Sequence, residues 1–179
     1  MEALDTVGNG RDGQSSLQVS GIGTVTMRAL ALEDLPAMQR LLGRCDAAAS
    51  EATVDAIIGS LDWRPAHAIT LTLGAIDERS NRLVGLAGLT ADGRIRGGAR
   101  FGLLVDPECR QRGVGRALLA ALVRAAERTG YRSLHGPASH GEAAIRALAR
   151  RTGFAIRRVD GDERFVLERS LGASGSGRP

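Results

Sequence analysis

The sequence has no lysine: all 24 of its Lys-or-Arg positions are arginine, in a chain of 179 residues with a net charge of +4. The missing lysine excludes a nucleotide-triphosphatase loop, which ends in Gly-Lys-Ser/Thr. Aromatic residues make up only 3% of the chain, whereas nucleic-acid interfaces usually add aromatic side chains or a reading motif to basic charge. We therefore expect a phosphorylated small molecule as the anionic partner, in preference to a nucleic acid.

Cysteines and long apolar runs are scarce too. Cys45 and Cys109 are the only cysteines, and they stand far apart in no metal-ligand spacing. Free thiols in a reducing compartment, and no metal, are the simplest expectation. No apolar run is long enough to span a bilayer, and the N-terminus lacks the basic and then apolar pattern of a signal peptide. These absences predict a cytoplasmic protein with no membrane partner.

The composition, with 43% hydrophobic and 25% charged residues, is that of an ordinary globular protein, and the length suits one domain. Residues 1–23 are rich in Gly, Ser, Asn and Asp and have no periodicity, which predicts a disordered N-terminal arm. The end of the chain, residues 171–179, has the same character and predicts a disordered tail. We therefore place one folded domain at residues 24–170.

Hydrophobic periodicity inside this domain predicts the order strand, two helices, three strands, helix, strand, helix, two strands. The expected strands are residues 24–30, 66–77, 82–90, 99–106, 131–136, 154–159 and 164–170. The expected helices are residues 35–45, 51–61, 116–128 and 141–153. This order predicts an α/β (α+β) chain with a mixed sheet of about seven strands flanked by about four helices, and it excludes an alternating doubly wound sheet.

The loop between strand 99–106 and helix 116–128 has two glycines, Gly113 and Gly115, among three arginines. The first N–H groups of a helix have no partner within the helix, and the helix dipole adds partial positive charge there. Glycine removes side chains that would keep a ligand away, and arginine forks suit phosphate oxygens. The loop therefore predicts a pyrophosphate cradle; a tight strand-to-helix turn is the alternative interpretation.

The six residues from Arg110 to Gly115, RQRGVG, satisfy the Gln/Arg-x-x-Gly-x-Gly/Ala hallmark of the GNAT superfamily of N-acetyltransferases, which bind acyl-coenzyme A. The chain resembles this superfamily over residues 24–169, most strongly over residues 101–154. The words YRSLHG and LARRTGF are most similar to those of the Pat-type bacterial protein-lysine acetyltransferases. The resemblance implies the GNAT fold, a mostly antiparallel sheet splayed between its fourth and fifth strands, and acetyl-coenzyme A as the acyl donor.

The resemblance also implies which residues hold acetyl-coenzyme A. Backbone amides from Gln111 to Arg116 would hold the pyrophosphate, and the main chain of residues 103–105 would pair with the pantetheine arm as an added strand does. Either Arg112 or Arg116 would reach the ribose phosphate. The implied binding residues are Leu103, Leu104, Val105, Arg110, Gln111, Arg112, Gly113, Val114, Gly115 and Arg116.

Amine acetylation uses a base that accepts a proton from the ammonium, and an acid can protonate the leaving thiolate. The sequence departs from its relatives at both usual positions: Arg100 replaces a glutamate base, and Ala149 replaces a tyrosine acid. We expect His135 or Glu142 as substitutes, because an imidazole titrates near neutrality and both residues flank the expected cleft. Strand-end hydrogen bonding and helix capping are their structural alternatives, and a water relay without a dedicated base is also feasible.

Three functions follow from these patterns. The first is an enzyme, an N-acetyltransferase that moves an acetyl group from acetyl-coenzyme A to a primary amine, either a protein lysine or a small molecule, by direct attack in a ternary complex. The second is a non-catalytic acyl-coenzyme A sensor or regulatory module, favoured by the two replaced positions. The third rests on the basic net charge alone, and it is RNA binding or the acetylation of aminoacyl-RNA. The expected protein is bacterial and is a monomer or homodimer.

Overall fold

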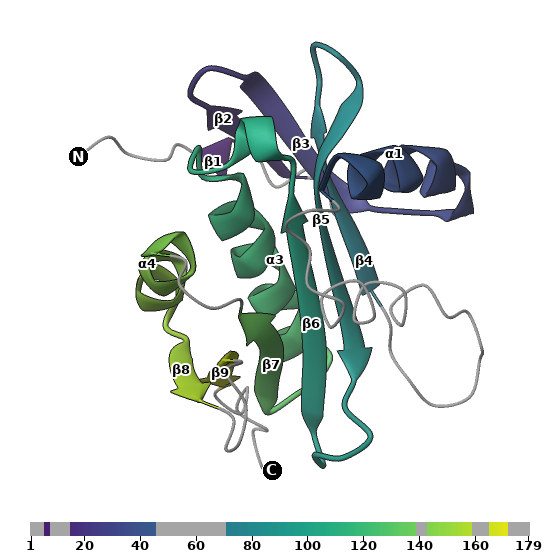
Figure 1. Ribbon diagram of the computed structural model, residues 1–179. Helices are drawn as coiled ribbons and strands as arrows, with labels where there is room; N and C mark the ends of the chain where they lie inside the picture. Colours follow the sequence, from purple (N-terminus) through teal and green to yellow (C-terminus); the bar gives the residue numbers. More distant parts are fainter. Residues whose placement is uncertain (1–5, 8–14, 46–70, 139–142, 159–164, 172–179) are drawn as a thin grey trace.

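The computed structural model of the protein describes residues 6–7, 15–45, 71–138, 143–158 and 165–171. These residues form one sheet of nine strands, in the order β1-β2-β3-β4-β5-β6-β7-β9-β8 (Figure 1). The strands are β1 (Thr6–Val7), β2 (Ser15–Val19), β3 (Gly23–Ala29), β4 (Leu71–Asp77), β5 (Arg82–Ala91), β6 (Gly98–Val105), β7 (Ser133–Ala138), β8 (Ala155–Arg158) and β9 (Phe165–Ser170). The α-helices are α1 (Leu35–Cys45), α3 (Val114–Arg128) and α4 (Ala143–Thr152).

Every neighbouring pair of strands is antiparallel except β6 and β7, which are parallel. This confirms the predicted α+β class with a mixed, mostly antiparallel sheet. The predicted helix at residues 51–61 and the first residues of the predicted strand 66–77 lie outside the described residues.

Both predicted domain limits are corrected by the structure. The sequence predicts a disordered arm up to residue 23, but β2 pairs with β3 and buries Leu17 and Val19. Two apolar residues among polar ones give little periodicity, so the pairing partner decides this strand. At the other end, the sequence places Leu171 in the tail, but its side chain is buried and its N–H donates to the Arg132 carbonyl at 2.7 Å.

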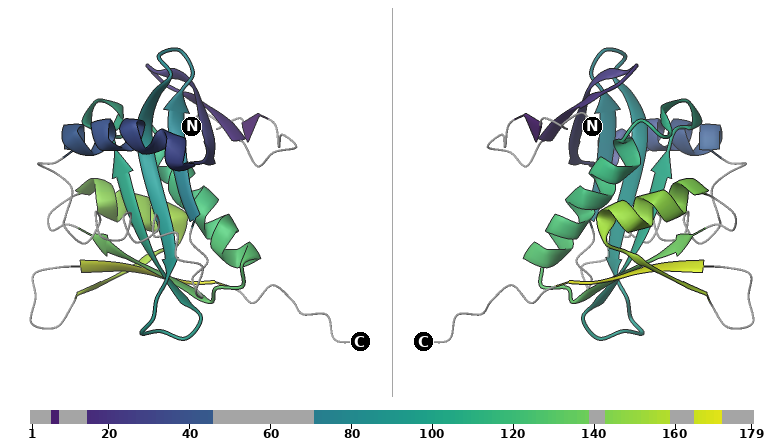
Figure 2. Two further views of the ribbon diagram at one scale, coloured as in Figure 1. Left: turned by 90° about the vertical axis from the view of Figure 1, so that its right-hand side faces the viewer. Right: turned by 90° about the vertical axis from the view of Figure 1, so that its left-hand side faces the viewer.

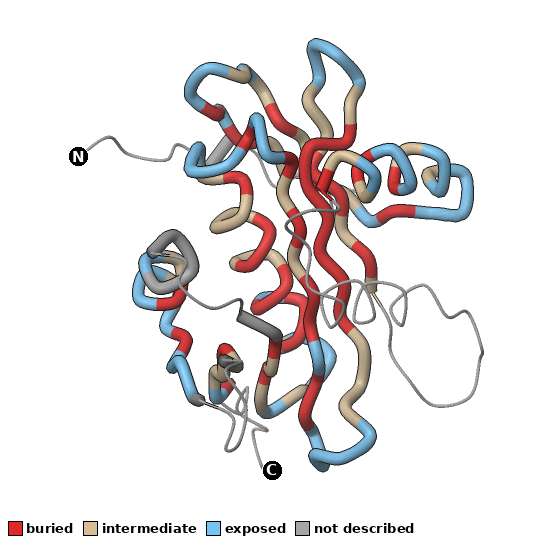
Figure 3. The backbone as a smooth tube through the Cα atoms, in the orientation of Figure 1, coloured by how far each residue is buried: buried red, intermediate tan, exposed pale blue. Residues whose placement is uncertain are grey.

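Helices cover both faces of the sheet. α1 lies in front of the sheet in the left view of Figure 2, and α3 and α4 lie in front of it in the right view. The face under α1 has a small apolar cluster that includes Met38, Leu41 and Leu104. The face under α3 has the larger cluster, which includes Phe101 and Leu118. Buried residues therefore run almost continuously along β5 and β6, at the centre of the molecule (Figure 3).

The parallel strands β6 and β7 separate after three paired residues. Their register runs from Gly98 opposite Ser133 to Arg100 opposite His135, and both strands then continue without pairing to each other. This confirms the predicted splay between the strands called fourth and fifth in the sequence analysis.

Two residues of β7 explain why the strands separate. The Arg132 carbonyl points toward β9, because it accepts a hydrogen bond from the Leu171 N–H. Main-chain groups alternate in direction along a strand, so the nitrogen of Pro137 points the opposite way, toward β6. Proline has no N–H, so it ends the ladder at that point. A Cβ atom on Gly136 would lie 2.4 Å from the Phe101 ring, so glycine allows the ring to pack beneath the open strand.

Candidate functional site

The loop after β6 presents free main-chain donors. Within the described part of the chain, no group accepts a hydrogen bond from the N–H groups of residues 111–116, and the first helical bond joins Ala117 N–H to the Gly113 carbonyl at 3.0 Å. Gln111 and Gly113 both have positive φ, 59° and 95°. Left-handed residues in such a loop turn neighbouring N–H groups toward one side, as in anion-binding nests.

The outer surface of this loop is open at Gly113. A Cβ atom there would meet nothing within 4 Å, whereas one on Gly115 would lie 3.4 Å from the Val105 side chain. The two glycines therefore differ: Gly113 leaves the donors accessible and adopts a φ that favours glycine, while Gly115 lies against the end of β6. Free donors at an open helix N-terminus form a site that accepts an anion.

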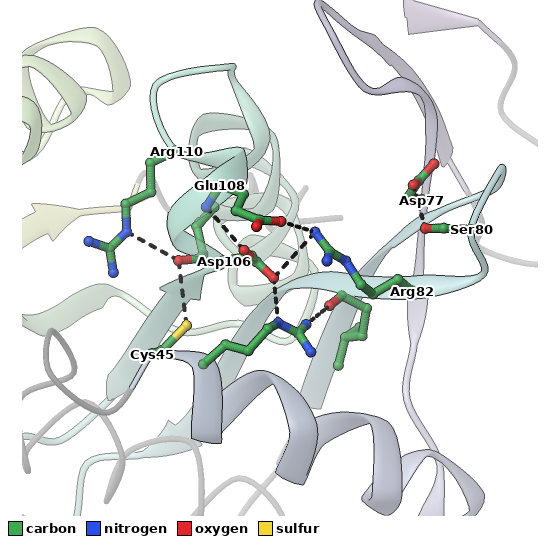
Figure 4. A network of polar contacts seen from close by, with 10 residues as sticks. Cys45, Asp77, Ser80, Arg82, Asp106, Glu108 and Arg110 are labelled. Atoms are coloured by element: carbon green, nitrogen blue, oxygen red, sulfur yellow. Dashed lines mark hydrogen bonds and ion pairs between the residues drawn. The ribbon is translucent and has the colours of Figure 1, made fainter.

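A buried carboxylate fixes the point where β6 becomes this loop. Asp106 is fully buried, and its Oδ2 accepts a hydrogen bond from Arg44 Nε at 2.7 Å (Figure 4). Its Oδ1 accepts from the Glu108 N–H at 3.1 Å, and Arg82 lies 3.7 Å away. Arg82 also bonds the Glu108 carboxylate, which raises the pKa of its guanidinium although burial opposes the shift. This network ties the end of α1 to the start of the loop.

The three arginines of the loop have different partners. Arg110 Nε donates to the Val105 carbonyl at 3.3 Å, and the Cys45 thiol donates to the same carbonyl oxygen, with its Sγ 3.7 Å away (Figure 4). Arg112 donates to the Gly21 carbonyl at 3.0 Å, which ties the loop to the β2–β3 turn. Arg116 makes no hydrogen bond or ion pair with any described residue. Of the two arginines expected near the ribose phosphate, Arg116 is the one left available.

The open edge of β6 presents fewer main-chain groups than the sequence predicts. The Asp106 N–H donates to the Val84 carbonyl of β5 at 3.0 Å, so by alternation Leu104 also turns its N–H and C=O toward β5. This corrects the prediction for Leu104. The main chain of Leu103 and the N–H of Val105 face the splay, where no described group bonds them.

Arg100 and His135 lie together at the vertex of the splay, on the α1 face of the sheet. They are the last opposed pair of β6 and β7, so their side chains lie on the same face of the sheet. Side chains alternate along a strand, so Leu104, four residues after Arg100, lies on this face too, and it packs in the cluster under α1. Arg100 is exposed, and His135 is half-buried with Nε2 3.0 Å from Ser133 Oγ. The other catalytic candidate, Glu142, lies outside the described residues.

The usual position of the tyrosine acid points into the core here. Ala149 is fully buried in the cluster under α3, so α4 does not turn this residue toward the splay. Tyr131 is half-buried against the same cluster, and burial raises the pKa of its phenol. Neither position supplies an acid beside Arg100 and His135.

Neither Cys45 nor Cys109 forms a disulfide, which agrees with the predicted thiols, and the structure shows in addition that both side chains are buried. Burial, and then the nearby Asp106 carboxylate, raises the pKa of the Cys109 thiol. Among the residues that the structure describes, no group of three His, Cys, Asp or Glu side chains could hold a metal ion. In the same ranges, no helix is both long and apolar enough to cross a membrane.

Sequence reasoning missed the Asp106 network and the two residues that open the splay. An Asp-Pro pair directly after a strand is a helix-capping signal, so the sequence indicates Asp106 as a cap. Its partners Arg44 and Arg82 are far away in the sequence, so no local pattern predicts these contacts. Gly136 and Pro137 inside a strand also give a readable signal for a strand that loses its pairing.

The fold and this site define an α+β protein with a splayed sheet, in which an open strand edge leads directly into a loop of free N–H donors. The chain belongs to the Acetyltransferase (GNAT) family, whose profile matches residues 35–154. No curated protein matches the sequence.

Similar solved structures agree on this fold. The GNAT domain of S. lividans PAT has a TM-score of 0.71 at 14% identity, covering 92% of this chain and 100% of that one. A phosphinothricin acetyltransferase from Sinorhizobium meliloti, in complex with AcCoA, has a TM-score of 0.64 at 21% identity, covering 87% and 92%. The ribosomal-protein-S18-alanine N-acetyltransferase from Escherichia coli has a TM-score of 0.63 at 23% identity, covering 87% and 99%. At such identities the likeness establishes the fold alone.

Proposed function

We propose that this protein is an N-acetyltransferase that transfers an acetyl group from acetyl-coenzyme A to a primary amine, on a protein lysine or on a small molecule. The observation that carries the proposal is the run of N–H donors at residues 111–116 that bond no described group, directly after the open edge of β6. Family membership supports it, and so do similar structures that hold AcCoA or coenzyme A. The cytoplasmic location, the bacterial source and the monomer or homodimer state stay predictions.

The donors and the strand edge would hold successive parts of the coenzyme. The pyrophosphate would accept hydrogen bonds from residues 111–116, and the pantetheine arm would bond the main chain of Leu103 and the N–H of Val105 as an added strand does. Five steps along β6 separate Val105 from Arg100, about 17 Å at 3.3 Å per residue. An extended arm would therefore bring the thioester close to the vertex of the splay.

At the vertex, His135 would accept the proton from the attacking amine. Ser133 contacts one ring nitrogen of His135, and the imidazole has a second nitrogen for proton transfer. The neutral amine would attack the thioester carbonyl directly, the tetrahedral intermediate would collapse, and the coenzyme thiolate would leave and take up a proton. Glu142 stays the second candidate for the base.

A non-catalytic acyl-coenzyme A sensor is the second candidate function. Two observations favour it: an exposed arginine at position 100 where relatives have the base, and a buried alanine at position 149. Both leave the binding loop intact while removing the usual catalytic groups.

Release of free thiol from acetyl-coenzyme A separates these functions. The full chain is incubated with acetyl-coenzyme A and a panel of primary amines and lysine peptides, and acetylated products are identified by mass spectrometry. Amine-dependent thiol release with an acetylated product supports the enzyme. Tight coenzyme binding without turnover on any acceptor supports the sensor, and failure to bind the coenzyme contradicts both.

A further inference from the structure

A groove lined by arginines lies between α3 and the C-terminal end of α4. Its volume is about 690 Å³, which is within the range of small-molecule sites. Among the described residues, four arginines and one carboxylate, Glu127, line it; the arginines are Arg116, Arg124, Arg151 and Arg169. The groove begins at the first turn of α3, and so it adjoins the loop of free donors.

One of these arginines is held in place by the fold. Arg169 Nη1 donates to the Thr152 carbonyl at 2.5 Å, and its guanidinium lies 5.9 Å from the centre of the Phe154 ring. Its Nη2 is 3.9 Å from Glu127 Oε1, and its side chain is only 31% exposed. A positioned and partly desolvated guanidinium can bind an anion without losing much side-chain entropy on binding.

The other three arginines have no described counter-ion. Arg116, Arg124 and Arg151 make no hydrogen bond or ion pair within the residues that the structure describes. Arg116 stands in the first turn of α3, where the helix dipole disfavours a cation. Like charges gathered in one groove repel one another, and Glu127 offsets one charge of the four. The groove therefore has an excess of positive charge that an anion would relieve.

Arg116 and Arg124 lie on the stretch of α3 that lines the groove. They are two turns apart, about 12 Å along the helix axis, and both line the same groove. Helical side chains lean toward the helix N-terminus, so both side chains lean along the groove toward the loop after β6. Arg151 of α4 and Arg169 of β9 line the groove as well, so three elements bring positive charge to the space beside that loop.

We propose that this groove binds a phosphate monoester between α3 and α4. One source is the 3′-phosphate of coenzyme A bound at the loop, and this arm of the inference rests on the proposed function. The other source is a free phosphate ester that occupies the groove independently. Guanidinium groups match the geometry of phosphate oxygens and form charge-assisted hydrogen bonds with them.

Calorimetry of the full chain with coenzyme A, dephospho-coenzyme A and inorganic phosphate tests the proposal. We expect coenzyme A to bind about tenfold more tightly than dephospho-coenzyme A. Arg124→Gln and Arg151→Gln should remove this difference while leaving the affinity for dephospho-coenzyme A unchanged. The matched controls Arg128→Gln on α3 and Arg150→Gln on α4, which do not line the groove, should keep the tenfold preference. Circular dichroism checks that each variant folds.

The outcomes separate this inference from the proposed function. If neither coenzyme binds the wild-type chain, the proposed function fails, and the phosphate titration alone decides about the groove. If the coenzymes bind equally but phosphate binds and Arg124→Gln abolishes that binding, the groove holds a free phosphate ester. If the coenzymes bind equally and phosphate either fails to bind or binds Arg124→Gln as well as it binds wild type, the groove is not a phosphate site.

Discussion

The two ends of the splayed edge of β6 differ in what they are made of. At the C-terminal end, the groups that would bind a ligand are backbone N–H donors, held by Gly113 and by the buried Asp106 network. At the vertex, the groups are two side chains, Arg100 and His135, one of them exposed. A backbone site depends on the fold and tolerates many side chains, whereas a side-chain site changes with one substitution. From this comparison we predict that the proposed coenzyme binding and the proposed catalysis can be separated by substitution.

The largest effect is expected at the anchor of the C-terminal end. Asp106→Ala should lower the free energy of unfolding by about 3 kcal/mol, because it leaves Arg44 and Arg82 without their buried partner. Coenzyme affinity should fall as well, because β6 and the loop lose their junction. Urea denaturation and calorimetry measure the two effects.

The control for Asp106→Ala is Glu108→Ala, which removes an exposed partner of the same Arg82. It should lower stability by less than about 1 kcal/mol, as exposed ion pairs do. Equal losses for the two variants would mean that burial of Asp106 contributes nothing to the junction.

The next effect is expected at the vertex and tests the separation directly. His135→Ala should lower kcat about 100-fold, because a general base is removed. Coenzyme affinity should stay unchanged, because the loop donors are not touched. An unaltered kcat would remove His135 from catalysis, and Ser133→Ala controls for the loss of the hydrogen bond alone.

A smaller effect is expected where the two strands separate. Gly136→Ala places a Cβ atom 2.4 Å from the Phe101 ring, which should destabilise the fold by about 1–3 kcal/mol. The double variant with Phe101→Leu should recover part of this loss, because the smaller side chain leaves room. Thermal unfolding of the single and double variants gives the coupling, and strictly additive losses would contradict the contact.

The smallest effect concerns the thiol beneath the loop. Burial raises the pKa of Cys109, so the group stays a protonated thiol at a pH where a thiolate in the unfolded chain would already form. Alkylation of native protein at pH 8, followed by mass spectrometry, should therefore be much slower than in urea. Rapid native labelling at Cys109 would show that the junction opens readily.

Local patterns in the sequence predicted the fold class correctly. The predictions failed where pairing between residues far apart in the chain determines the structure. The loop from Arg110 to Gly115 and the order of the elements are local patterns, so the fold class was predictable from them, whereas the splay was expected only from the resemblance to the GNAT superfamily. β2 was not predictable, because Leu17 and Val19 become strand residues through pairing with β3. The direction of the Leu104 main chain depends on the register with β5, which no residue type encodes.

Coenzyme binding to Gly113→Glu tests the central claim most directly, with Gly113→Ala as its matched control. Both variants carry the same penalty for a side chain at φ 95°, but only glutamate brings a bulky negative charge to the loop donors. By calorimetry, we predict that Gly113→Glu loses measurable coenzyme A affinity while Gly113→Ala retains most of it, with both folded by circular dichroism. Unchanged affinity in folded Gly113→Glu would contradict the claim that residues 111–116 hold the diphosphate.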